Sequence, residues 1–241
     1  MSGHSHAKTI KHQKNITDQK RGQVFSKLAK MIAVAVKEAG PNPETNYRLK
    51  VAIDTAHAQN MPNDNIERSI KRGSGELDDE EKLEEFSLEA YGPKGIAIII
   101  EGITDNRNRT LGEVKQILGQ YNGKLVPEGS VIWLFDRKGV IMIDTKAQSS
   151  SGEDIEMAAI EAGAEDIKSQ EDMMEIRVKT ENLYKVKKNL EEKGIKTDSA
   201  SVDLIPKEEI ALTEQEIESC QKLFDALDEN DSVQQIYSNL K

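Results

Sequence analysis

The sequence predicts an α+β fold built from three domains. Apolar residues recur at helical spacing between residues 18 and 73, which predicts an N-terminal helical bundle. An abrupt change to Gly, Ser and acidic residues follows, and strand and helix patterns then alternate along the rest of the chain. We expect a basic arm plus helical bundle at 1–78, a discontinuous mixed α/β domain at 79–134 and 207–241, and an inserted α/β domain at 135–206.

The first domain is expected to contain three helices behind an arm without regular structure. The apolar spacing predicts a helix from about residue 18 to the Gly-Pro pair at 40–41. Asn42 then predicts the N-cap of a second helix, because a proline follows it at the first helical position. The helical spacing of Ile66 and Ile70 predicts a shorter third helix.

The second domain is expected to be a sheet covered by helices. Phe86, Leu88 and Ala90 alternate as in a half-buried strand, and 95–103 is a continuous apolar run typical of a central strand. A helical pattern begins near Thr110. This order predicts a strand pair followed by a helix that packs back on it.

The inserted domain follows from the order of its elements. The patterns predict strand 139–144, helix 153–162, strand 165–169, strand 173–179, helix 181–193 and strand 197–205. This βαββαβ order is that of the ferredoxin-like fold.

The last segment, 207–241, is too short to be a domain. Thr213 and Glu216 form the T-x-x-E pattern of a capping box, which predicts a further helix. Since the ferredoxin-like domain already has two helices for its four strands, we expect this segment to pack against 83–130.

Charge is distributed unevenly along the chain. The formal net charge is −10 at pH 7, yet residues 1–75 contain nine Lys and four Arg against six acidic residues. A basic end on an acidic body can contact phosphate while the remaining surface stays solvated. Flexible lysines suit neutralisation of a nucleic-acid backbone, although a solvated tail is the alternative. The candidate nucleic-acid-binding residues are His4, Lys8, Lys11, His12, Lys14, Lys20, Arg21, Lys27, Lys30, Lys71, Arg72, Arg107 and Arg109.

Arg107 and Arg109 belong to the stretch TDNRNRT, which is expected at a strand-to-helix turn. A helix N-terminus with two arginines favours anions. Neighbouring Asp and Asn residues are also turn and cap formers, and the arginines could pair with acid from a neighbouring domain. We favour this capping or interdomain role over direct contact with nucleic acid.

No pattern in the chain indicates an enzyme or a cofactor. There is no P-loop, no G-x-G-x-x-G after a strand, no G-x-S-x-G and no Cys-His pairing. Cys220 falls on the apolar face of a helix and is expected to be a buried small residue. Removal of Met1 would leave an N-terminal Ser-Gly-His, which binds copper or nickel adventitiously in any chain, so no metal function is expected.

Membrane association is not expected either. No stretch approaches the roughly 18 apolar residues of a membrane span, and no secretory signal precedes the basic arm. We expect a cytoplasmic monomer.

Several short stretches are specific when taken together. They are SGHS, IKH, D-x-x-RG, NMP-x-DNI, YGPKG, TDNRNRT, GSVIWLF, EAGAED and DSVQQIYSN. In this order the chain resembles the YebC/PmpR family over its whole length. The resemblance implies a transcriptional regulator, a ribosome-associated translation factor that relieves stalling at proline runs, or a mitochondrial translational activator. Family members commonly read G-H-S-K-W near the start, whereas this chain has His6 and Ala7 at the last two positions, which implies an altered arm tip.

The functional hypothesis is therefore a non-enzymatic nucleic-acid-binding regulator of gene expression. Its partner is DNA, or ribosomal or transfer RNA on the ribosome. RNA is favoured on physical grounds, because a lysine arm without a helix-turn-helix offers little to read the major groove. The alternative is a protein-interaction scaffold that binds no nucleic acid.

Overall fold

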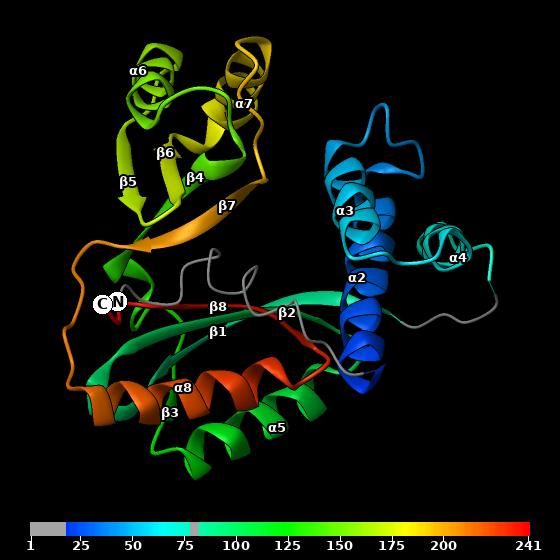
Figure 1. Cartoon of the computed structure of the whole chain (residues 1–241). Helices are drawn as coiled ribbons and strands as arrows, with labels where there is room; N and C mark the ends of the chain where they lie inside the picture. The colour runs from blue at the N-terminus through cyan, green and yellow to red at the C-terminus, as the bar shows by residue number, and fades with distance from the viewer. Residues whose placement is uncertain (1–17, 78–81) are drawn as a thin grey trace. The chain divides into compact units, whose positions relative to one another are not determined.

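The structure is a computed structural model that describes residues 18–77 and 82–241. The predicted basic arm lies outside these residues, as does part of the acidic linker. The described chain forms two compact units, one made of residues up to 132 together with 210–241, and one made of 133–209 (Figure 1). No helix among the described residues is long and apolar enough to cross a membrane.

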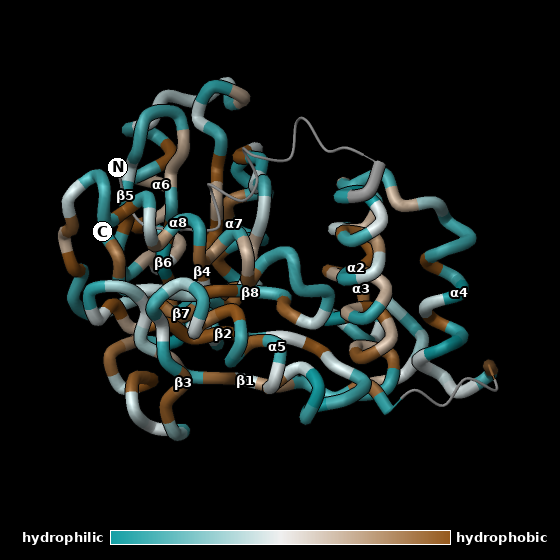
Figure 2. The backbone as a smooth tube through the Cα atoms, turned by 90° about the horizontal axis from the view of Figure 1, so that it is seen from below, coloured by the Kyte–Doolittle hydropathy of each residue, from teal (hydrophilic) through white to brown (hydrophobic). Residues whose placement is uncertain are grey.

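The first unit begins with the three expected helices, α2 (Asp18–Ala39), α3 (Tyr47–Ala58) and α4 (Asn63–Gly73). α3 and α4 pack mainly on α2 rather than on each other. Their shared core includes Leu28, Ile32, Leu49, Ala52 and Ile66. α4 is mostly hydrophilic with short hydrophobic bands, as expected for a helix that buries one narrow face (Figure 2).

The expectation that Asn42 caps the second helix is wrong, because Asn46 does so. Asn46 is 2% exposed, and its side-chain oxygen accepts a hydrogen bond from the backbone N–H of Leu49 at 3.0 Å. Its side-chain nitrogen donates to the carbonyls of Ala35 at 2.7 Å and Gly40 at 2.8 Å. One side chain therefore caps α3 and satisfies the end of α2, which a turn-forming Asn42 cannot do.

A four-stranded antiparallel sheet completes the first unit. It contains β1 (Glu84–Tyr91), β2 (Ala97–Thr104), β3 (Lys124–Val126) and β8 (Val233–Ser238) in the order β3-β1-β2-β8. Helices α5 (Arg107–Gln120) and α8 (Glu214–Asp228) cover one face (Figure 1). The core between them includes Phe86, Ile98, Val114, Leu118 and Leu223.

The C-terminal segment thus returns to the sheet that begins near residue 84, as expected. The last strand of this segment, β8, pairs with β2, which is the predicted apolar strand. The predicted capping box is present at the start of α8, where the carboxylate of Glu216 accepts the backbone N–H of Thr213 at 3.0 Å. Cys220 is fully buried in the same core, and burial raises the pKa of its thiol.

The helical part and the first sheet share contacts within this unit. Ala33 and Val34 of α2 pack against Leu83 and Ile103 in a small apolar cluster. The proposed division of the chain into three domains with the boundaries given above stays a prediction.

The second unit has the ferredoxin-like fold. Its elements are β4 (Phe135–Asp144), α6 (Gly152–Ala162), β5 (Asp166–Gln170), β6 (Met173–Val178), α7 (Leu183–Glu192) and β7 (Ser199–Pro206). The sheet order is β5-β6-β4-β7 with every pair antiparallel, and both helices contribute to one core. β4 begins four residues before the expected position because its first residue, Phe135, pairs with Pro206. Short 3₁₀ turns lie at 93–95, 132–134, 145–147 and 180–182.

Candidate nucleic-acid interface

The predicted cations that the structure describes lie in three places. His4, Lys8, Lys11, His12 and Lys14 lie outside the described residues. Lys20, Arg21, Lys27 and Lys30 lie on α2, Lys71 and Arg72 lie in the last turn of α4, and Arg107 and Arg109 lie in the first turn of α5.

The cations of α2 divide into an exposed pair and an engaged pair. Lys20 and Arg21 are exposed, and the guanidinium of Arg21 lies 5.9 Å from the ring centre of Phe25. By contrast, the ammonium of Lys27 contacts both the backbone oxygen of Asp228, at 2.6 Å, and its carboxylate, at 2.8 Å.

Lys30 makes a comparable contact, since its ammonium donates to the backbone oxygen of Asp231 at 3.0 Å. Both lysines therefore bind the segment around the C-terminal end of α8, where the helix dipole favours positive charge. The side chain of Lys27 is only 14% exposed. These two lysines hold α2 against the end of α8. Because their ammonium groups already have partners, they are weaker candidates for phosphate contact than the sequence pattern indicates.

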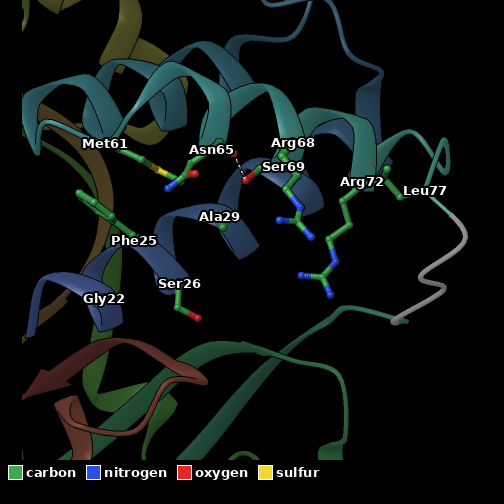
Figure 3. A pocket seen from close by; sticks show the side chains of 10 residues that line it. All are labelled: Gly22, Phe25, Ser26, Ala29, Met61, Asn65, Arg68, Ser69, Arg72 and Leu77. Carbon is green, nitrogen blue, oxygen red and sulfur yellow. Dashed lines mark hydrogen bonds between the residues drawn. The ribbon is translucent and has the colours of Figure 1, made fainter. Parts of the chain in front are cut away.

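A groove of about 610 Å³ lies between α2 and α4. Figure 3 shows the side chains of Phe25 and Met61 toward one end and those of Arg68 and Arg72 toward the other. No Asp or Glu is among the described residues that line it. The lining residues are Gly22, Phe25, Ser26, Ala29, Met61, Asn65, Arg68, Ser69, Arg72 and Leu77.

The close approach of α4 to α2 sets the position of the arginines. A Cβ on Gly73 would lie 2.4 Å from the carbonyl oxygen of Ala33 and 2.7 Å from the Cβ of Val36. Such distances are not tolerated, so only glycine permits this packing. Because Arg68 and Arg72 are one helical turn apart, both project from the same side of α4.

Arg68 was not among the sequence-based candidates. Its side chain is exposed and forms no ion pair with any residue in 18–77 or 82–241. The sequence signal that could have identified Arg68 is its spacing, because Arg72 follows it by four residues on the same amphipathic helix. The spacing indicates a shared site only once the packing of α4 on α2 places both arginines along one groove.

A second groove, of about 560 Å³, brings together three predicted cations, Lys30, Arg72 and Arg109. It is also lined by four carboxylate residues, Asp105, Glu113, Glu229 and Asp231. Positive charge is therefore locally balanced, and an anionic ligand is less favoured here than in the groove between α2 and α4.

The TDNRNRT turn is a helix cap. The side-chain oxygen of Asn106 accepts the backbone N–H of Arg109 at 3.1 Å, which confirms the capping role. The guanidinium of Arg109 pairs with Asp105 and lies 3.8 Å from Glu113. The expectation of pairing with a neighbouring domain is thus wrong for Arg109, because the acid comes from its own turn and helix. Arg107 is exposed and makes no ion pair within the described chain.

Metal ligands do not cluster in the described residues, where no group of three His, Cys, Asp or Glu is placed to hold an ion. The thiol of Cys220 is buried with a raised pKa, so it stays protonated and is a poor nucleophile.

Comparison with known proteins gives end-to-end matches. The family model described as "TACO1/YebC protein N-terminal domain" matches residues 5–76, and "TACO1/YebC second and third domain" matches residues 83–240. A probable transcriptional regulatory protein of Caldanaerobacter subterraneus subsp. tengcongensis is 46% identical over 241 residues, covering 100% of this chain and 98% of the relative. One from Thermoanaerobacter pseudethanolicus is 44% identical, covering 100% and 97%.

A solved structure is also similar. The crystal structure of a conserved hypothetical protein from Aquifex aeolicus superposes with a TM-score of 0.85 at 42% sequence identity. The match covers 93% of this chain and 91% of the other.

Proposed function

Because this chain belongs to the TACO1/YebC family, whose relatives described above are named probable transcriptional regulatory proteins, we propose that it is a non-enzymatic regulator that binds nucleic acid. It acts in the cytoplasm as a monomer and needs no cofactor.

The observation that carries this proposal is the groove between α2 and α4. Its described lining residues include Arg68 and Arg72 and no carboxylate, in a chain whose formal net charge is −10. Arginine is the side chain best suited to phosphate, because its planar fork donates two parallel hydrogen bonds. Exposed Lys20, Arg21 and Lys71 extend the same basic part of the molecule.

The arrangement of the helices favours RNA over DNA. In a helix-turn-helix the N-terminal residues of the second helix contact base edges in the major groove. The first turn of α4 carries Asp64 and no cation, whereas Arg68 and Arg72 lie further along the helix. We therefore propose that the basic end contacts ribosomal or transfer RNA phosphates on the ribosome, with DNA binding at promoters as the other branch.

A salt series tests the proposal. The protein is applied to immobilised heparin, to RNA and to DNA at increasing NaCl, and the logarithm of the binding constant is followed against the logarithm of salt. We expect a slope that reflects several phosphate contacts, at about 0.7 to 0.9 per contact. Failure to bind any of these polyanions at low salt would refute nucleic-acid binding.

The alternative is a protein-interaction scaffold, and one feature of α6 favours it. Met157 and Ile160 lie one helical turn apart and are 66% and 64% exposed. Exposed apolar pairs occur at protein contacts, but single exposed apolar residues are common on any surface. A scaffold would lose partner binding in a Met157→Ser, Ile160→Ser variant while showing no retention on nucleic acid.

A further inference from the structure

We propose that the groove between α2 and α4 holds an unstacked nucleotide of a single strand, with the base at its apolar end and the phosphate at its arginine end. This inference deepens the proposed function and rests on it. It specifies which form of nucleic acid the groove accepts.

Two sequence motifs converge on this groove from distant parts of the chain. Gly22 ends the stretch D-x-x-RG on α2, and Met61 and Asn65 belong to NMP-x-DNI at the start of α4. Neither motif takes part in an ion pair or a metal site among the described residues. Met61 and Ile66 of the second motif also belong to the core of the bundle, and the shared location of the two motifs gives them a common role as walls of the groove.

The two ends of the groove differ in chemistry. Phe25 and Ala29 supply partly exposed apolar surface beside the buried Met61, and the guanidinium of Arg21 lies over the ring of Phe25. Aromatic rings and guanidinium planes are the surfaces on which unpaired bases stack. At the other end Figure 3 shows Arg68 and Arg72 extending side by side, as a phosphate requires.

Polar groups between the two ends are available to a ligand. The side chains of Ser26 and Asn65 line the groove and make no hydrogen bond to another residue in the described ranges. The groove volume of about 610 Å³ falls within the roughly 300 to 1,000 Å³ of small-ligand sites. It can therefore hold a nucleotide, whereas the bases of an intact duplex stay stacked out of reach.

Gly22 provides a test that preserves the fold. It lies within α2, is exposed, and a Cβ added there meets no atom within 4 Å. Gly22→Leu fills the groove mouth and improves helix propensity, so the protein stays folded. Gly119→Leu is the matched control, because Gly119 is an equally open helical glycine on α5 that does not line the groove.

The experiment measures fluorescence anisotropy of a labelled 12-nucleotide oligouridylate and of a 12-base-pair RNA duplex at one salt concentration. We expect Gly22→Leu to weaken single-strand binding about tenfold, the loss of one stacked base, and to change duplex binding less than twofold. Gly119→Leu should change neither. Arg68→Ala should lower the single-strand salt slope by about 0.7, whereas Lys50→Ala on α3 should not.

The outcomes separate this inference from the proposed function. If Gly22→Leu binds the single strand as tightly as the unmodified protein, or weakens single strand and duplex equally, the groove does not hold a base and the inference fails while nucleic-acid binding stands. If the unmodified protein binds neither oligonucleotide, the proposed function fails, and the inference fails with it.

Discussion

Replacing Glu89 by glutamine should loosen the loop that follows β3. Glu89 lies on β1 and is 6% exposed. One of its carboxylate oxygens accepts the backbone N–H of Gly129 at 2.7 Å, and the other accepts those of Val131 at 2.6 Å and Ile132 at 3.0 Å. A glutamine has one acceptor oxygen, so its amide nitrogen must face at least one of these donors.

The magnitude follows from the number of donors. A buried donor left unpaired costs about 1 to 3 kcal/mol, and the remaining bonds lose the strengthening that an ionised acceptor provides. We expect local opening of residues 129–132 to become easier by about 3 kcal/mol, which corresponds to roughly hundredfold faster amide hydrogen exchange. Glu84→Gln, on the same strand but exposed, is the control and should change nothing.

The effect should also depend on pH. Burial acts to raise the pKa of Glu89, but the backbone N–H donors of the loop outweigh burial and lower it. Stability from a lowered carboxyl pKa is complete above the unfolded value, about 4.3, and is lost as the pH falls through the folded value. The difference between the two proteins should therefore shrink below about pH 4. Equal exchange of Gly129, Val131 and Ile132 in both proteins at pH 7 would refute this reasoning.

Three further predictions concern the basic part of the chain. Replacing both Arg68 and Arg72 by alanine should lower the salt slope for single-stranded RNA by about 1.4, measured by anisotropy, with Lys50→Ala unchanged. Deleting residues 1–16 should reduce the slope by about 0.7 to 0.9 per lost contact without lowering the melting temperature, because the segment precedes the first described helix. Gly73→Ala should destabilise the protein by about 1 to 3 kcal/mol in chemical denaturation, since its Cβ would collide with the backbone of α2; an unchanged midpoint would contradict the packing described here.

Local signals in the sequence predicted most of the fold. The apolar spacing of α2, the capping box at Thr213 and the βαββαβ order are each contained within a few dozen residues. The cap of α3 was not predictable in this way. Asn42 and Asn46 both have the right chemistry, and the choice depends on the carbonyls at the end of α2 that only the folded bundle brings to Asn46.

The candidate site was less accessible from sequence, because its composition depends on tertiary packing. A count of cations selects Lys27 and Lys30 as readily as Lys20, yet the first two are engaged with residues two hundred positions away. The same count overlooked Arg68, which becomes a candidate only because it lines the same groove as Phe25. Charge runs thus indicate the basic region, but packing decides which cations are available.

Crosslinking in cells, followed by sequencing of the attached nucleic acid, tests directly whether the protein binds RNA in the cell. We expect enrichment of ribosomal or transfer RNA, reduced in the Arg68→Ala, Arg72→Ala variant and retained in Lys50→Ala. Recovery of defined promoter DNA with no enrichment of these RNAs would contradict it.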